Sequence, residues 1–236
     1  MPPRPHRTPR RTEALTRERI IDTAVELLDT AGESGLTFRA LTQRLNTGPG
    51  AIYWHVANKT ELLDAATDTV ITTALTTHPT HTPTTPHDHI HTTALSLYHA
   101  IDHHPWLATQ LATQLSRNPA QPVTPRIYES IGQQVQALGI PQNTWFTATS
   151  ALVHYILGAA GQNATNATHA RTRTPHTTRT EFLDTTSTAW QQLDPDTYPF
   201  TRAIADQLRH HDDQTEFLAG ITLILTGITT LHPPTG

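Results

Sequence analysis

Apolar residues recur at intervals of three and four along most of this chain, and this spacing constrains the fold to helices. The first such segment, residues 16–31, carries Ile20, Ile21, Ala24, Val25, Leu27, Leu28 and Ala31. These positions share one face of a helix, which Thr16 can cap and Gly32 can end. No stretch alternates apolar and polar residues over a useful strand length. We therefore expect an all-α fold.

Three further helices are predicted close behind the first. One covers 37–45, the next starts at Pro49 after the tight turn 46–48, and the third covers about 59–77. Asn58, followed by Glu61, resembles a capping box at the start of this third helix. Six more helices are expected downstream, over 89–103, 105–117, 124–138, 141–161, 179–193 and 214–231.

Two segments lack helical signals. Residues 78–88 hold prolines and histidines among threonines, which predicts a linker. Residues 162–178 have almost nothing to bury and are expected to be mobile. We accordingly predict a basic disordered arm over 1–13, a helix-turn-helix domain over 14–60 and a helical domain over 61–236, connected by the helix at 59–77.

The charge distribution supports this division. Residues 1–60 hold nine basic and six acidic residues, so the head carries +3, while the rest of the chain carries −7. A basic head on an acidic body suits a protein whose first domain alone contacts a polyanion. The absence of cysteine excludes thiolate catalysis and favours the cytoplasm. No apolar run has the length expected of a bilayer span, and the basic start is not a secretory signal, so no membrane partner is predicted.

The helices on either side of the turn 46–48 have helix-turn-helix dimensions. The second displays Tyr53, Trp54 and His55 beside Lys59, the only lysine of the chain. Such a group suits a nucleic-acid backbone better than an apolar core. The alternative is that Tyr53 and Trp54 form the core of a small helical domain, as aromatic residues at helical spacing usually do.

Three strings carry a family resemblance: residues 16–28, Gly35-Leu36-Thr37-Phe38-Arg39-Ala40-Leu41, and residues 51–63, which include Tyr53-Trp54-His55-Val56-Ala57-Asn58-Lys59. Together they resemble the DNA-binding domain of the TetR family of bacterial repressors, and the last string looks like its tetracycline repressor branch. The resemblance covers about residues 14–77. The remainder is similar only in its helix pattern and in the segment 216–221.

The resemblance implies roles in DNA binding. Arg39 would reach a base edge or phosphate, and Lys59 a phosphate at the start of its helix. The groove floor would be faced by Pro49, Gly50 and Ala51, and the backbone by Tyr53, Trp54 and His55. Asn46 replaces the usual glycine of the turn but tolerates a left-handed backbone. Because residues 49–51 carry no hydrogen-bonding side chain, we expect an operator that differs from the tetracycline operators, read mostly by Arg39 and Tyr53.

A DNA reader of this size usually works as a homodimer. Residues 145–160 and 217–231 are apolar on more than one face and hold small residues that permit close helix approach, which suits a four-helix dimer core. The predicted interface residues are Leu152, Ile156, Ala159, Leu218, Ile221, Leu225 and Ile228. The alternative is that both segments are central helices of a monomer.

The resemblance also implies a ligand cavity between the helices of 89–161. The predicted lining residues are Leu97, Ile101, Trp106, Leu111, Leu115, Ile127, Ile131, Val135 and Tyr155, although each could equally belong to the core. The ligand would be a mostly apolar small molecule. The tetracycline repressors hold their drug with a histidine where this chain has Leu75, which argues against a tetracycline–magnesium effector.

No cofactor and no metal are predicted. The histidines at 87, 89 and 91 could bind zinc or nickel, but without Cys or Glu partners a solvated linker is the default. The sequence as a whole predicts a repressor that binds a palindromic double-stranded operator as a homodimer and is released by a small effector. The alternatives are an activator or ligand-blind DNA-binding protein and, with no catalytic motif to support it, a ligand-binding enzyme or carrier.

Overall fold

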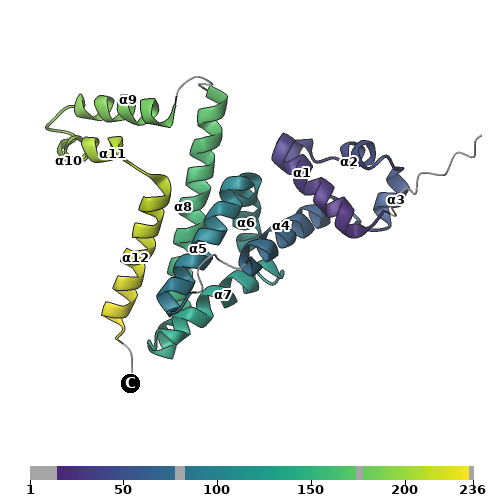
Figure 1. The fold of residues 1–236 in the computed structure, drawn as a ribbon, viewed down its shortest axis with the longest axis horizontal. Coiled ribbons are helices and arrows are strands. Elements are labelled where there is room, and N and C mark those ends of the chain that lie inside the picture. The colour runs from purple at the N-terminus through teal and green to yellow at the C-terminus, as the bar shows by residue number, and fades with distance from the viewer. Residues whose placement is uncertain (1–14, 78–82, 174–177, 234–236) are drawn as a thin grey trace, which may run out of the picture. The chain divides into compact units, whose positions relative to one another are not determined.

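The computed structural model describes residues 15–77, 83–173 and 178–233, and within these ranges it is helical with no strand (Figure 1). The all-α prediction is confirmed. The chain divides into two compact units between Ala66 and Thr67, and we describe them one at a time. The predicted basic arm, residues 1–13, lies outside the described residues.

The first unit holds the helices that the sequence predicts near the amino terminus. They are α1 (Arg17–Gly35), α2 (Phe38–Leu45), α3 (Pro49–Tyr53) and the first part of α4 (Lys59–Thr76). The hydroxyl of Thr16 accepts a hydrogen bond from the backbone N–H of Arg19 and so caps α1. Gly32, predicted to end this helix, has a left-handed φ of 64° and interrupts it. Helix starts and stops in this unit therefore follow from local chemistry.

The turn between α2 and α3 depends on one residue. Asn46 ends α2 with φ 48° and ψ 52°, the left-handed conformation in which its backbone N–H bonds to the carbonyl of Thr42. Asparagine accepts this conformation more readily than other residues with a side chain. Leu41 and Ile52, on either side of the turn, are fully buried. The turn thereby fixes the angle at which α3 leaves the small core.

The second unit is built around a long central helix. It contains α5 (Pro86–His103), α6 (Trp106–Arg117), α7 (Val123–Ala137), the 3-10 turn η1 (Gln142–Thr144), α8 (Trp145–Arg173), α9 (Arg179–Gln191), α10 (Pro199–Ala203), α11 (Ala205–Arg209) and α12 (Asp213–Leu231). Helix α8 packs against α5, α6, α7 and α12, whereas α9 packs with the short helices α10 and α11 (Figure 1). The main core of this unit lies along α8.

Two predicted non-helical segments are partly helical. Helix α5 starts at Pro86 rather than at 89, because Thr85 and Asp88 form a reciprocal capping box with two bonds of 3.1 Å. Helix α8 continues to Arg173, although 162–178 was expected to be mobile. In this extension Thr165 and Thr168 bond back to the carbonyls four residues earlier. A polar sequence thus stays helical here, while residues 78–82 and 174–177 are outside the described ranges.

Helices α10 and α11 were not predicted. Each has only five residues, which is too short for a periodic apolar pattern. Arg202 ties α10 to the end of α9 through hydrogen bonds to the carbonyls of Gln191 and Leu193. On α11, the carbonyl of Ala205 accepts a 2.7 Å bond from the buried hydroxyl of Ser187. Contacts distant in sequence therefore hold these two helices.

Helices α8 and α12 approach each other closely at Gly220. A Cβ atom at this position would collide with the ring and hydroxyl of Tyr155, and that hydroxyl donates a 3.2 Å bond to the carbonyl of Phe217. The Tyr155 and Phe217 rings stack with centroids 5.9 Å apart. Gly220 is one of the small residues that were predicted to permit close helix approach between two copies. It permits a close approach of α8 and α12 within one chain.

Helix α12 requires one correction. By length and composition it could cross a membrane, so the prediction that no segment has this property is wrong. One such helix is weak support for a membrane span, since helices of water-soluble proteins pass the same test. Its buried side chains form a single stripe that faces α5 and α8, namely Phe217, Ile221, Leu225 and Ile228.

Replacing Asn46 tests the turn. Asn46→Gly should leave the free energy of unfolding within about 0.5 kcal/mol of the original, because glycine adopts a positive φ without strain. Asn46→Val should lower it by about 1–2 kcal/mol, because a β-branched residue resists this conformation. Urea unfolding of the full chain, followed by circular dichroism, measures both. Equal stability of the two variants would contradict the assignment.

Candidate nucleic-acid interface and ligand pocket

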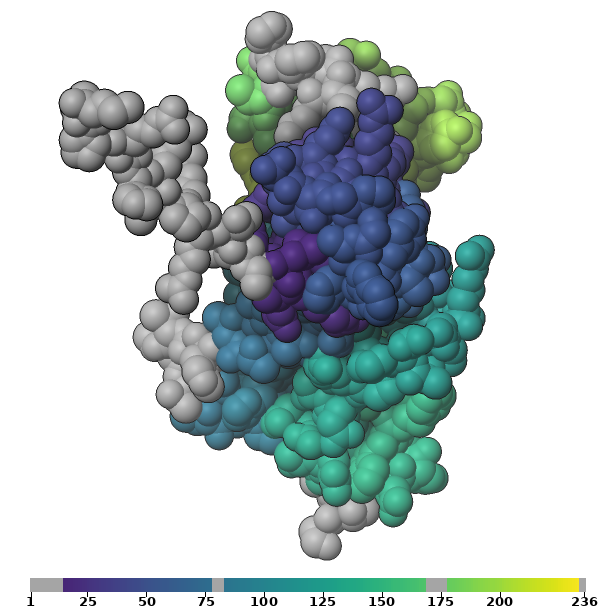
Figure 2. Space-filling model, turned by 90° about the vertical axis from the view of Figure 1, so that its right-hand side faces the viewer, coloured from purple at the N-terminus to yellow at the C-terminus, as the bar shows by residue number. Residues whose placement is uncertain are grey.

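Helices α2 and α3 present an exposed surface, and Figure 2 shows this face of the first unit in dark blue. On α3, Pro49 and Gly50 are exposed and Ala51 is half-buried. Arg39, on α2, is exposed as well. The predicted residues of both helices therefore lie at the surface, where a polyanion can reach them.

Trp54 is the most exposed large apolar side chain among the described residues, with 89% of its surface accessible. Ile52 and Val56, on either side of it, are fully buried and hold this segment in the core. The alternative that Trp54 is a core residue is therefore wrong. An apolar ring held in water by buried neighbours is typical of a binding surface.

Tyr53 is partly a packed side chain and partly an exposed one. Its ring stacks on Phe38 of α2 with centroids 4.5 Å apart and planes within 10° of parallel, yet 55% of the side chain stays exposed. The stack links α2 to α3 across the turn, since aromatic pairs stabilise by more than their buried area. The free part of the ring remains available for a backbone contact.

Lys59 has a structural contact that the sequence did not reveal. Its ammonium donates a 2.5 Å hydrogen bond to the carbonyl of Glu33, close to the end of α1. A cation at this end also complements the helix dipole. At the start of α4, the Asn58 side chain accepts from the N–H of Glu61, and the Glu61 carboxylate accepts from the N–H of Ala57. Phosphate binding by Lys59 stays a prediction.

Ion pairs lie at the surface of the described part of this unit. Arg44 lies 3.4 Å from Glu26, and Arg17 lies 3.6 Å from Glu61. Glu18, in the first turn of α1, has its pKa lowered by hydrogen bonds from the backbone and from Thr16, and by the positive charge of Arg17. His55, which is half-buried, lowers it further. With two basic and five acidic residues, α1 is itself net acidic, so the positive charge of the head lies on other segments.

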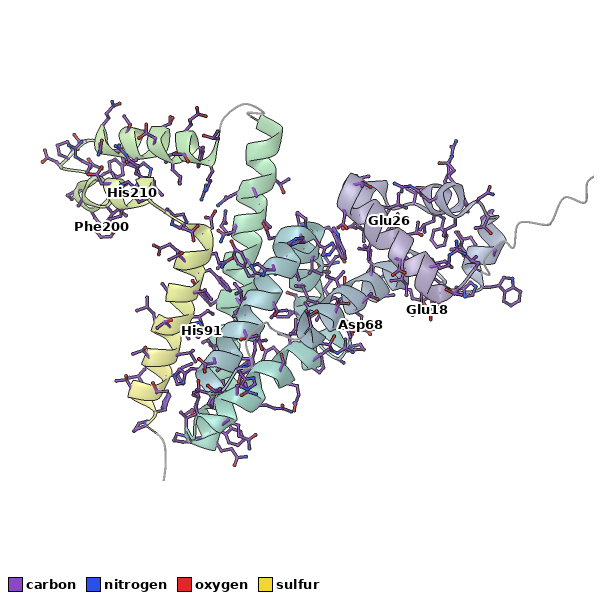
Figure 3. All side chains as sticks on the ribbon, in the orientation of Figure 1. Glu18, Glu26, Asp68, His91, Phe200 and His210 are labelled. Atoms are coloured by element: carbon purple, nitrogen blue, oxygen red, sulfur yellow. The ribbon has the colours of Figure 1, made fainter. Side chains whose placement is uncertain are left out.

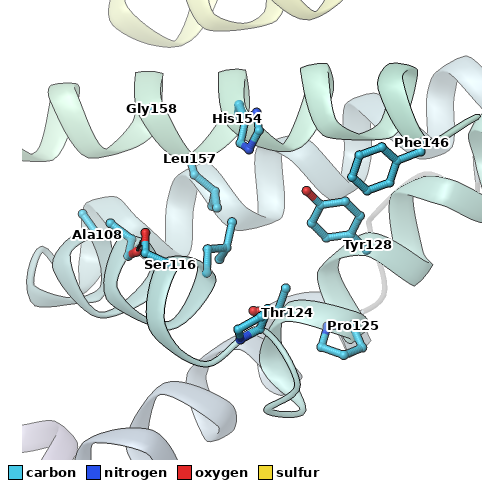
Figure 4. A pocket seen from close by; sticks show the side chains of 12 residues that line it. Ala108, Ser116, Thr124, Pro125, Tyr128, Phe146, His154, Leu157 and Gly158 are labelled. Atoms are coloured by element: carbon cyan, nitrogen blue, oxygen red, sulfur yellow. Dashed lines mark hydrogen bonds between the residues drawn. The ribbon is translucent and has the colours of Figure 1, made fainter.

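A pocket of about 640 Å³ lies in the second unit between α6, α7 and α8 (Figure 4). Its lining is Ala108, Ala112, Leu115, Ser116, Pro119, Thr124, Pro125, Tyr128, Phe146, His154, Leu157 and Gly158. Most of these side chains are apolar or aromatic. Their size and composition match those of small-molecule sites.

The predicted lining residues lie mostly elsewhere. Of the nine, only Leu115 lines this pocket. Leu97, Ile101, Trp106, Leu111, Ile127, Ile131 and Val135 are buried in the core of the unit. Tyr155 packs on Phe217 of α12, and burial raises the pKa of its hydroxyl. Apart from Leu115, the lining combines small, polar and aromatic side chains from three helices and a loop, a set that apolar periodicity alone does not bring together.

The predicted interface residues require a similar correction. Leu152, Ile156, Ile221, Leu225 and Ile228 are buried within the chain itself, so they have no surface left to give to a partner. Ala159 and Leu218 are half-buried. On α12 the exposed positions include Ala219 and Leu223, and Leu223 is 74% accessible. Because α12 is apolar on more than one side, its sequence pattern did not show which face is buried within the chain and which is exposed.

The histidines at 87, 89 and 91 belong to helix α5 and not to a linker. His91 lies between α5 and α12 (Figure 3), where Thr222 is 3.4 Å from its Nε2 atom. Burial lowers its pKa, and the nearby charge of His87 lowers it further. In the described part of the chain, no three His, Cys, Asp or Glu side chains gather closely enough to hold a metal.

Two family models match this architecture. Residues 20–66 match the bacterial regulatory proteins of the tetR family, and residues 79–232 match the tetracyclin repressor-like C-terminal domain. The second match alone covers more than half of the chain. The protein therefore belongs to the TetR family, as its sequence predicted.

Individual relatives agree with this assignment. The tetracycline repressor protein class C of Escherichia coli is 45% identical over 74 residues, 31% of each chain. An HTH-type transcriptional regulator of Saccharopolyspora erythraea is 30% identical over 156 residues, 66% of this chain and 64% of its own length. The chain thus spans about a third of the first relative and just under two thirds of the second.

A solved structure covers almost the whole chain. The transcriptional regulator SCO7222, a TetR protein from Streptomyces coelicolor, is 63% identical, with a TM-score of 0.82 over 93% of this chain and 100% of its own. The predicted class is confirmed: the chain is a transcriptional regulator, not an enzyme, with a DNA-binding domain followed by a ligand-binding domain.

Replacing Lys59 separates its two roles. Lys59→Ala should flatten the dependence of log affinity on log salt concentration by about one unit, because one phosphate contact is lost. It should lower the stability by less than about 1 kcal/mol through the contact with Glu33. Operator titrations at several salt concentrations measure the slope, with Lys59→Arg as the charge-preserving control. A lower stability with an unchanged slope would limit Lys59 to the structural role.

Proposed function

We propose that this regulator is a repressor that binds a palindromic operator as a homodimer and is released by a small, mostly apolar effector. The observation that carries the DNA-binding part is the exposed Trp54 at the end of α3, between the buried Ile52 and Val56. Repressors in which a short helix enters the major groove need such a surface. We further propose that it acts in the cytoplasm, where its operator would lie.

The DNA contacts divide into two kinds. Tyr53, Trp54 and His55 would lie along the phosphate backbone and fix the register of α3, with Lys59 as a charged anchor. Pro49, Gly50 and Ala51 offer only apolar contact to the groove floor, so Arg39 would carry most of the hydrogen-bonded readout. Sequence preference should then be concentrated at the few base pairs that Arg39 reaches.

Two-fold pairing would use the outer face of α12. Leu223 is exposed at its middle, next to small residues that permit close approach. Leu231 of the same helix is 76% accessible as well, and an extended exposed apolar surface is typical of a contact between proteins. Exposed residues of α8 outside the pocket lining, such as Ala151 and Gln162, would complete a four-helix contact between two copies.

The pocket between α6, α7 and α8 would hold the effector. Thr124 and Pro125 of α7 belong to its wall, and the next residue, Arg126, reaches α4. Arg126 forms a 2.6 Å ion pair with Asp68, labelled in Figure 3, and donates a hydrogen bond to Thr72. Since α4 starts at Lys59, movement of the first turn of α7 would pass along this helix. An effector that binds the displaced state better would lower operator affinity by population shift.

Selection of bound duplexes from a random pool tests the proposal as a whole. We expect a palindromic site whose half-sites lie about one helical turn apart, with two chains bound to each duplex. Recovery of a non-palindromic site bound by one chain would overturn the homodimeric repressor. A reporter gene behind the recovered site then separates repression from activation, the remaining alternative within this fold.

Replacing Trp54 tests the DNA surface. Trp54→Ala should weaken operator binding by about 1–2 kcal/mol, roughly five- to thirtyfold, as expected for an exposed aromatic contact. The unfolding free energy should change by no more than about 0.5 kcal/mol. Arg39→Ala is the contrasting variant, because it should relax sequence preference as well. Fluorescence anisotropy with operator and mutated duplexes measures both. Unaltered binding by Trp54→Ala would remove this residue from the interface.

Replacing Leu223 tests the pairing surface. Leu223→Glu should convert the homodimer to a monomer, because a buried unpaired carboxylate opposes association, and operator affinity should fall at least tenfold. Phe182→Glu on α9 is the matched control, since Phe182 is also exposed and apolar. Sedimentation velocity measures the assembly. If only Phe182→Glu dissociates the dimer, pairing runs through α9 and not through α12.

A further inference from the structure

The lining of the pocket contains no lysine, arginine, aspartate or glutamate. A charged ligand buried against this wall would lose hydration without gaining a permanently charged partner, which is unfavourable. The polar groups that do line the pocket are hydroxyls and the exposed His154. The composition of the pocket wall therefore disfavours ionic ligands.

Thr124 is the exception among the hydroxyls of this wall. Only 8% of the residue is exposed, and its Oγ1 atom is buried without a hydrogen-bond partner. The unpaired hydroxyl has a local cause. Thr124 is the second residue of α7, so the residue four positions earlier, Ala120, precedes the helix. Within α8, by contrast, Thr165 donates to the carbonyl of Gly161 at 2.8 Å.

An unpaired buried hydroxyl destabilises the free protein, and a valine of the same shape would avoid the loss. A group retained at such a cost is typical of a functional site. Figure 4 shows Thr124 across the pocket from Leu157 and Gly158, with Tyr128 and Phe146 to one side. The Tyr128 and Phe146 rings are stacked with centroids 6.3 Å apart, and the Tyr128 hydroxyl lies 3.3 Å from that of Ser150. The wall thus offers aromatic surface and one unpaired polar group.

We propose that the pocket takes an uncharged, largely aromatic molecule with a hydroxyl or carbonyl group, and that Thr124 forms the hydrogen bond that recognises this group. Thr124 lines the pocket although its oxygen is buried, so a rotation about the Cα–Cβ bond brings the oxygen to the ligand. Threonine populates two rotamers in helices, which makes the rotation accessible. This inference rests on the proposed effector site, but not on the operator.

The proposal predicts opposite effects of one substitution on stability and on binding. Thr124→Val should raise the melting temperature by about 2–4 °C, because it removes an unpaired polar group. The same variant should weaken binding of a hydroxylated ligand about three- to tenfold, since one neutral hydrogen bond is lost. A purely structural hydroxyl would instead lower the melting temperature on removal.

Three matched probes test the recognition: fluorene, 9-fluorenol and fluorene-9-carboxylate, titrated against the full chain without DNA. Fluorenol should bind most tightly and the carboxylate most weakly. Thr124→Val should lose the preference for fluorenol over fluorene, and Thr124→Ser should restore it. Thr147→Val, an exposed position on α8, is the control and should behave as the original.

Four outcomes would overturn the proposal. They are no binding of fluorenol, tightest binding of the carboxylate, an unchanged preference in Thr124→Val, or a lower melting temperature of that variant. Adding the operator afterwards separates this inference from the proposed function. If fluorenol binds as expected while operator affinity stays unchanged, the ligand assignment stands and release by a ligand at this site fails.

Discussion

The burial of one face of α8 is the interaction on which the carboxyl-terminal unit depends. Leu152, Val153 and Ile156 are fully buried where α8 packs against α5, α6, α7 and α12. Each such side chain contributes about 1.5–3 kcal/mol when it is removed from water. Four helices pack on α8. The orientation of α8 about its own axis therefore determines which of its residues are buried and which remain at the surface.

The outer residues then become available for function. His154, Leu157 and Gly158 belong to the pocket wall, while the close contact between Tyr155 and Gly220 holds α12 against the inner side. Helix α12 likewise buries one stripe of side chains within the chain and leaves Leu223 exposed on the opposite face. The effector site and the pairing surface that we propose therefore lie on surfaces that the folding of a single chain does not use.

The release by an effector that we propose would run through α4 and α7. Arg126 joins the first turn of α7 to Asp68 and Thr72 by charge-assisted hydrogen bonds, which are stronger and more directional than neutral ones. The first turn of α7 thus contributes both to the pocket wall and to the contact with α4. A coupling of this kind requires only that the effector favour one of two positions of that turn, and no contact between effector and DNA is needed.

The sequence by itself determined the helical fold, the DNA-reading turn and the family, because caps, a left-handed asparagine and three- and four-residue spacing act locally and leave direct traces in the chain. It did not determine which face of α8 or α12 turns inward, since both helices are apolar on several sides. It also missed the capping box of Thr85, the two five-residue helices and the contact between Lys59 and Glu33, which arise from short or distant pairings. Only the tertiary structure assigned Leu152 to the core, Leu223 to the surface and Thr124 to a pocket, because burial depends on what the rest of the chain packs against each position.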